Sequence, residues 1–114
     1  MKNIKDILLE KLTLNKDSKN SDHISNKYLS INKNSSKDEI VYVIKELNKY
    51  ADKKDLKIMI RNYHTNTGDF CIFVYDKLKN GRYLVGYDGD WDSKNCNFQS
   101  CYEQSKKFID EFKR

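Results

Sequence analysis

The chain has 114 residues, with 22 Lys+Arg against 17 Asp+Glu and a formal net charge of +5. This length suits one domain, or one small domain with an arm. Hydrophobic residues make up 38% and charged residues 34%, which predicts a modest core beneath a strongly solvated surface. No run approaches the roughly 18 apolar residues that a membrane span needs, so no membrane partner is expected.

Cysteine usage and the N-terminal residues indicate a reducing compartment. The cysteines, Cys71, Cys96 and Cys101, are odd in number and lack CxxC spacing, which argues against a disulfide framework. The first six residues lack the apolar core of a signal peptide. The chain is therefore expected to be soluble and cytoplasmic, with reduced thiols and no cofactor.

The composition also suggests an origin. Arginine occurs only three times, alanine once and proline never, whereas Lys, Asn and Ile, which have AT-rich codons, are abundant. This bias predicts a low-GC bacterium or one of its mobile elements.

The lysines alternate with Asp and Glu along the chain, which favours a solvated surface over a stripe that binds nucleic acid.

The N-terminal part is expected to be an arm. Apolar residues at helical spacing predict a short amphipathic helix over residues 3–13, formed around Ile4, Ile7, Leu8 and Leu12. Residues 15–35 are polar and predict a tether, in which residues 28–31 are the one stretch able to dock as a short strand. We divide the chain into residues 1–35, helix plus tether, and residues 36–114, a compact domain. The arm's helix must dock on the domain or on a second copy, which would give a homodimer.

The domain itself begins with a helix and a strand. Ser36 and Glu39 have capping-box spacing, and an apolar stripe continues the helix to about residue 53. Leu56 to Arg61 alternate between apolar and polar residues, as in a half-buried strand.

Two further strands and a helix complete the domain. Residues 70–75 form a β-branched and aromatic strand, Asn80-Gly81 is a hairpin signal, and residues 82–87 form the third strand. A final helix is predicted from Phe98, Cys101, Tyr102, Ser105, Phe108, Ile109 and Phe112.

The predicted fold class is α+β: a three-stranded antiparallel meander sheet with helices packed on one face, in the order α-loop-α-β-β-β-α. From Ser36 to Arg114 this order and size resemble the double-stranded-RNA-binding domain. That family's lysine cluster, at the start of the last helix, would fall at residues 95–100, where no lysine occurs. The resemblance is therefore one of layout.

An acidic stretch, residues 86–93, is the main candidate for a binding site. Asp88, Asp90 and Asp92 surround Trp91, the only tryptophan, in a basic chain. We predict that these four residues and Tyr87 contact a protein partner, because aromatic residues anchor interfaces and carboxylates steer association.

Other interpretations of this stretch remain open. The DxDxD start also matches a calcium loop, although Ser93 and Gln99 replace the expected Gly and Glu. Alternatively, the carboxylates belong to a solvated turn before the last helix, and Trp91 folds back over the edge of the sheet.

The sequence contains few candidates for catalysis, and we expect no enzymatic activity. His64 is a candidate base, but Cys71 and Cys101 fall at positions predicted to be buried. Of four tyrosines in or near the strands (Tyr63, Tyr75, Tyr83 and Tyr87), strand alternation places some on the face opposite the helices. They could bind protein, stack bases of a single strand, or form ordinary cross-strand pairs.

The predicted function is a small non-catalytic protein-binding protein. It would act as a stoichiometric inhibitor or immunity-type protein, anti-CRISPR, anti-restriction or antitoxin-like, carried by a phage or another mobile element. Its expected target is a nuclease, or another nucleic-acid enzyme, with a basic cleft. The alternatives are a nucleic-acid-binding protein using lysines and exposed tyrosines, and a divalent-metal-binding protein using the DGDWD residues.

Overall fold

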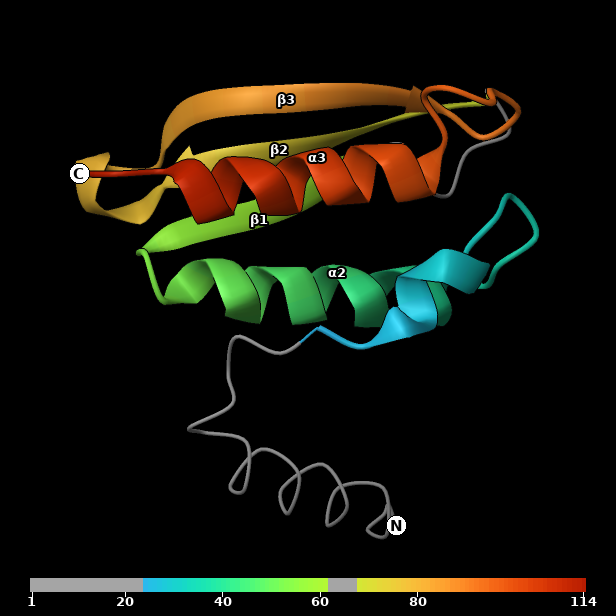
Figure 1. The fold of residues 1–114 in the computed structure, drawn as a ribbon, viewed down its shortest axis with the longest axis horizontal. Helices are drawn as coiled ribbons and strands as arrows, with labels where there is room; N and C mark the ends of the chain where they lie inside the picture. Colours follow the sequence, from blue (N-terminus) through green and yellow to red (C-terminus); the bar gives the residue numbers. More distant parts are fainter. Residues whose placement is uncertain (1–23, 62–67) are drawn as a thin grey trace, which may run out of the picture.

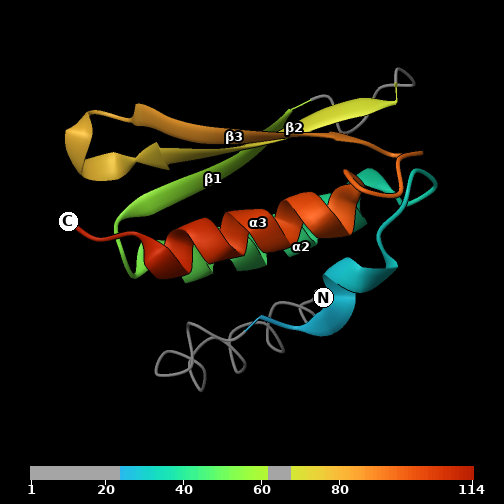
Figure 2. The same cartoon turned by 45° about the horizontal axis from the view of Figure 1, so that its top comes forward.

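The computed structural model describes residues 24–61 and 68–114, which form a sheet with two helices on one of its faces (Figures 1 and 2). The three strands are β1 (Leu56–Arg61), β2 (Asp69–Asp76) and β3 (Arg82–Asp90). They are antiparallel in the order β1-β2-β3, so the sheet is a meander. The predicted fold class is confirmed for this part of the chain.

The predicted arm helix at residues 3–13 lies outside the described residues. The expected homodimer through the arm and the division at residue 35 remain predictions.

Helix α2 (Lys37–Asp52) starts at the predicted capping box. The Ser36 hydroxyl accepts from the Glu39 backbone N–H at 3.1 Å, and the Glu39 carboxylate accepts from the Ser36 N–H at 2.7 Å. Helix α3 (Phe98–Glu111) begins after Asn97, whose side-chain oxygen accepts from the backbone N–H of Ser100 at 2.9 Å. Both helix N-termini therefore have the hydrogen-bond acceptors that their first N–H groups need.

The core lies between the helices and the sheet. Helix α2 packs against β1, and α3 crosses β2 and β3. The largest fully buried side chains come from both layers: Leu47 and Val43 of α2, Tyr102, Phe98 and Ile109 of α3, and Leu56, Phe70, Ile72 and Val74 of the sheet. This is the apolar stripe of each helix packed on the alternate residues of the strands, as the sequence pattern predicts.

The segment before α2 also packs on the helical layer. Tyr28 stacks on Tyr102 with ring centroids 4.3 Å apart, and Ile31 is buried. The predicted short strand at residues 28–31 is wrong, because Asn26–Ser30 form a 3-10 helix, η2. The Gln99 side chain donates to the carbonyl oxygens of Tyr28, Leu29 and Ile31, which fixes this segment beside α3 instead of at a sheet edge.

The β2–β3 connection confirms the hairpin at Asn80-Gly81. A 3-10 turn, η3 (Lys77–Lys79), is followed by Asn80 at φ 63° and Gly81 at φ 73°. Both residue types tolerate this left-handed conformation. No helix in the described ranges 24–61 and 68–114 has the length and apolarity to cross a membrane.

The third strand is longer than predicted. It runs to Asp90, so Asp88, Gly89 and Asp90 belong to β3 and not to a loop. They pair with Cys71, Phe70 and Asp69 respectively. Gly89 permits this, because a Cβ there would lie 2.2 Å from the Phe70 ring and 2.8 Å from Cys101 Sγ. The missing side chain lets Phe70 fill the core directly beneath the strand.

Candidate functional site

The sheet face opposite the helices carries the candidate site, and we call it the open face. No helix or strand of the described part covers it (Figure 2). Because Leu56, Ile58 and the buried alternate residues of β2 point to the helices, their neighbours point to the other side. The register brings together on this face Lys57, Met59 and Arg61 of β1, Cys71, Phe73 and Tyr75 of β2, and Tyr83, Gly86 and Asp88 of β3.

Three aromatic rings form the centre of the open face. The ring centroids of Phe73, Tyr75 and Tyr83 lie 6.0 to 6.1 Å from one another. The Arg61 guanidinium lies 5.0 Å from the centroid of the Phe73 ring. Tyr83 is 54% exposed and Met59 39% exposed. The cluster is thus held in place by its own contacts while keeping a large apolar area in water.

Gly86 lies beneath this cluster. A Cβ at this position would lie 3.0 Å from the Tyr83 hydroxyl and 3.1 Å from Phe73 Cδ1. Both rings therefore lie over bare backbone, and the glycine lets them approach each other across the strand. Next to it, the strand register shifts between Val74 and Tyr75, which leaves Leu84 without a partner on β2. This is a β-bulge of the kind that changes the direction of side chains at the edge of a sheet.

Asp88 lies at the other end of the open face, opposite Cys71. Burial raises the pKa of the Cys71 thiol to about 12, and the hydrogen bond to Asp88 acts in the same direction. Burial likewise raises the pKa of Cys101 to about 11. Both thiols are therefore protonated at neutral pH and are poor nucleophiles, as their predicted buried positions implied. Cys96 is exposed.

The predicted partner-binding residues lie on both sides of the sheet. Of Tyr87, Asp88, Asp90, Trp91 and Asp92, Asp88 faces the open side, whereas Tyr87 packs against the core beneath the sheet. Burial raises the pKa of the Tyr87 hydroxyl, with a smaller contribution from Glu111.

Trp91 packs back onto the domain. Its ring stacks on Phe98 at 5.6 Å and 5°, and it lies 4.7 Å from the Phe70 ring. This is the alternative expected from the sequence, in which the tryptophan extends the core at the sheet edge. Its remaining half-exposed surface lies just beyond Asp90, at the same end of the molecule as Asp88. A role for Trp91 in partner binding stays a prediction.

The aspartates around Trp91 have local partners. Asp90 accepts the backbone N–H of Asp92 at 2.9 Å, and Asp92 forms an exposed ion pair with Lys33 at 2.9 Å. Residues 24–61 and 68–114 contain no group of three or more His, Cys, Asp or Glu side chains placed to hold a metal ion. Asp88 and Asp90 belong to the extended strand β3 and not to a loop that would turn alternate carboxylates toward one ion.

Sequence reasoning missed several residues of the open face. It placed tyrosines there, and Tyr75 and Tyr83 confirm this, but it did not identify Phe73, Met59, Arg61 or Gly86. The period-two alternation of β1 and β2 carries the signal, but the strand register is needed to show that these residues are neighbours. His23, Tyr63 and His64 lie outside the described residues.

Comparison with protein-family models, with curated proteins and with solved structures finds no match for the chain.

Proposed function

We propose that the chain is a non-catalytic protein-binding protein that acts as a stoichiometric inhibitor. The observation that carries this proposal is the open face, where exposed Tyr83 and Met59 and the half-buried rings of Phe73 and Tyr75 lie on the side of the sheet without helices. Such a face is a ready-made contact surface, since its rings lose little conformational freedom when a partner covers them.

The residue types support a protein partner. Tyrosine, methionine, phenylalanine and arginine are enriched at protein interfaces, and Tyr and Arg are common among the residues that dominate binding energy. Met59 and Arg61 on β1 and Tyr83 on β3 place these three types on the same face, on either side of the central strand β2. The Phe73 ring beneath Arg61 holds the guanidinium against the face, ready for a carboxylate or a carbonyl of the partner.

The aspartates at one end of the open face add selectivity for partners with basic surfaces. Asp88 is exposed on the open face, and Asp90 and Asp92 follow it at the end of β3. Carboxylates at one end of an apolar face favour a partner with a basic rim. The carboxylates at this end therefore support, as the target, a nuclease or another nucleic-acid enzyme with a basic cleft. The proposed biological role is an immunity-type protein, anti-CRISPR, anti-restriction or antitoxin-like, of a low-GC bacterium or its mobile elements.

A specific observation favours a second function, binding of single-stranded nucleic acid. Lys57 and Arg61 flank Met59 on β1, beside the three rings, so that cations and stacking surfaces lie on the same face. Bases stack on aromatic side chains while cations contact phosphates. Asp88 on the same face would repel a phosphate backbone, and for this reason protein binding is the first proposal.

The test compares two exposed tyrosines on opposite sides of the domain. Tyr83 on the open face is 54% exposed and Tyr42 on α2 is 44% exposed. Tagged wild type, Tyr83→Ser and Tyr42→Ser are used to capture partners from a low-GC bacterial lysate treated with nuclease. We expect wild type and Tyr42→Ser to retain one protein at a fixed ratio, and Tyr83→Ser to lose it. Equal retention by both variants would remove the open face from the proposal.

A second measurement distinguishes the two candidate functions. The same three proteins are titrated with a fluorescent single-stranded oligonucleotide at several salt concentrations. On the inhibitor proposal none of them binds it appreciably. Binding that weakens steeply with salt and is lost in Tyr83→Ser would instead establish the nucleic-acid function.

A further inference from the structure

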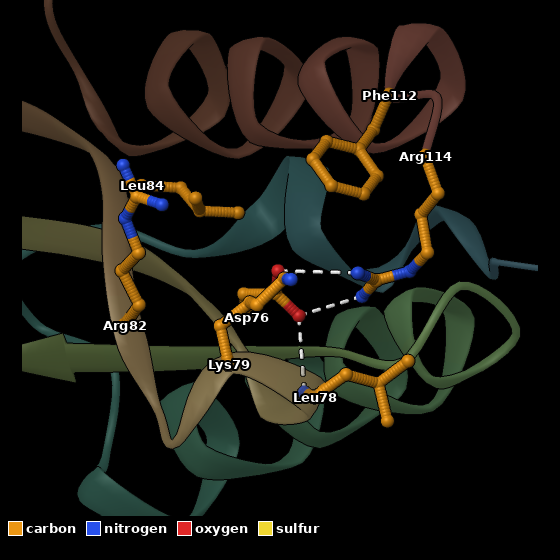
Figure 3. Close-up of a pocket in the computed structure, with 7 residues that line it drawn as sticks. All are labelled: Asp76, Leu78, Lys79, Arg82, Leu84, Phe112 and Arg114. Atoms are coloured by element: carbon orange, nitrogen blue, oxygen red, sulfur yellow. Dashed lines mark hydrogen bonds and ion pairs between the residues drawn. The ribbon is translucent and has the colours of Figure 1, made fainter.

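A pocket of about 530 Å³ lies at the hairpin end of the sheet, on the side of the helices (Figure 3). It is formed by the end of β2, the η3 turn, the start of β3 and the residues after α3. Its lining residues are Asp76, Leu78, Lys79, Arg82, Leu84, Phe112 and Arg114. Its volume falls within the range of small-molecule sites, and it is separate from the open face.

The ion pair between Asp76 and Arg114 in the pocket stabilises the fold. Asp76 is 4% exposed, and its carboxylate accepts two hydrogen bonds from the Arg114 guanidinium, at 2.6 and 3.1 Å, and a third from the Leu78 backbone N–H at 3.0 Å. Arg114 also donates to the carbonyl oxygens of Lys54 and Asp55. This pair forms one wall of the pocket, and its donors and acceptors are already used (Figure 3).

Two cations in the lining are not used in this way. The side chains of Lys79 and Arg82 are exposed, and neither forms a hydrogen bond or ion pair with another residue of the described ranges, although the charge of Lys79 contributes to the lowered pKa of Asp76. With Arg114 they set three positive charges against the single carboxylate of Asp76. The pocket therefore carries an excess of two positive charges, and the guanidinium of Arg82 keeps its donors available for an anion.

The pocket also offers an apolar surface. Leu84, the bulge residue of β3, and Phe112 are half-buried on one side, and Leu78 is 60% exposed at the rim. An exposed leucine beside two half-buried apolar side chains leaves a hydrophobic wall in water within reach of the cations.

We propose that this pocket binds a small organic anion, with a phosphate or carboxylate group held by Arg82 and Lys79 and an apolar body resting on Leu84 and Phe112. Neither the anionic group nor the apolar body of the ligand would match the whole lining by itself. A bare inorganic anion leaves the apolar wall of Leu84, Leu78 and Phe112 uncovered, and a neutral apolar molecule leaves the excess positive charge of the lining without a counter-charge. The site is independent of the protein partner proposed for the open face.

Three probes separate these contributions: phenyl phosphate, inorganic phosphate and phenol. Each is titrated into the full chain at low salt and followed by amide chemical shifts. We expect phenyl phosphate to bind about tenfold more tightly than either of the others, with shifts at residues 78–84 and 112–114. Equal affinity for phenyl phosphate and inorganic phosphate would overturn the proposal, because the apolar wall would then contribute nothing.

Two charge-removing variants test the position of the anion. Arg82→Gln removes a pocket charge from an exposed side chain, so the fold should survive, and it should weaken phenyl phosphate binding by about tenfold. Lys45→Gln, the control, removes the same charge from an exposed side chain of α2 and should leave the affinity unchanged. Equal weakening by both variants would mean that the anion responds only to net charge, and the assignment of the pocket would be wrong.

Discussion

Both faces of the sheet carry contacting aromatic side chains, but these are buried on the covered face and partly exposed on the open face. On the covered face, Phe70 and Phe98 are almost completely buried and contact each other at 5.8 Å. On the open face, Phe73 and Tyr83 contact each other at a similar distance, 6.0 Å, but Tyr83 remains 54% exposed. The same ring–ring contact therefore belongs to the core in one place and to the surface in the other.

The difference separates stability from binding. A fully buried aromatic side chain contributes its whole transfer free energy to folding, whereas a half-exposed ring contributes only part of it. The rest of its transfer free energy is gained only when a binding partner covers the ring. The covered face therefore accounts for the stability of the domain, and the open face holds apolar area that folding leaves uncovered. Substitutions matched across the two faces test this separation.

The largest effect is expected in the core. Phe98 is 1% exposed and touches the rings of Phe70, Trp91 and Tyr102. Phe98→Ala should cost about 3–5 kcal/mol of the free energy of unfolding. A domain of this size has only about 5–15 kcal/mol in total. Chemical denaturation should therefore show a protein close to unfolding.

The control for this variant is Phe108→Ala on the same helix. The sequence pattern places Phe108 on the buried stripe, but the structure leaves it half-buried. Phe108→Ala should lower the free energy of unfolding by less than about half the loss expected for Phe98→Ala, because a half-buried ring removes less apolar area from water on folding. A Phe108→Ala variant as unstable as Phe98→Ala would contradict the assignment of the core.

The second prediction concerns one glycine on each side of β3. A Cβ on Gly89 would lie 2.2 Å from the ring of Phe70, which is 2% exposed and has no space to move. Gly89→Ala should therefore cost about 1–3 kcal/mol of the free energy of unfolding. In Gly86→Ala the new methyl meets Tyr83 and Phe73 at 3.0 to 3.2 Å on the open face, where Tyr83 turns aside into water.

Denaturant midpoints measure both glycine variants. Gly86→Ala should cost less than about 1 kcal/mol. It should nonetheless disturb the aromatic cluster, so that partner binding weakens while stability is nearly kept. The separation of the two faces fails if Gly86→Ala is the more unstable of the two.

The glycines also show how far the sequence predicts the fold. Helical periodicity and strand alternation predicted α2, β1 and α3, because in these elements one face is buried and the pattern records it. The sequence did not predict that β3 continues through Asp88 and Gly89, because Asp and Gly are rare in strands. Pairing with Phe70 and Cys71 outweighs that preference, and such long-range pairing is not visible in a local window.

The candidate site was harder to predict than the fold. A lone tryptophan among aspartates looks like an exposed anchor, but stacking on Phe98 places Trp91 partly in the core. The open face, in contrast, is assembled from alternate residues of three strands, and no single stretch of sequence contains it. Its tyrosines were recognisable one by one, but their contact with Phe73 and Arg61 depends on the strand register.

The third prediction compares a carboxylate from each side of the sheet. Asp76 is buried, and the Arg114 guanidinium lowers its pKa below the usual value. A lowered pKa in the folded state stabilises the fold at pH above the unfolded value of about 3.9, and this contribution is lost as pH falls through the folded value. Asp76→Asn should therefore lower the melting temperature by several degrees at neutral pH, whereas Asp88→Asn, on the exposed side, should change it little.

The pH dependence provides the decisive readout for this pair. Melting temperatures of wild type and both variants are measured from about pH 7 to about pH 2. The gap between wild type and Asp76→Asn should be largest above about pH 5 and shrink in acid, because protonated Asp76 no longer attracts Arg114. The gap for Asp88→Asn should stay small throughout. A gap for Asp76→Asn that persists unchanged in acid would show that Asp76 acts through its shape and hydrogen bonds and not through its charge.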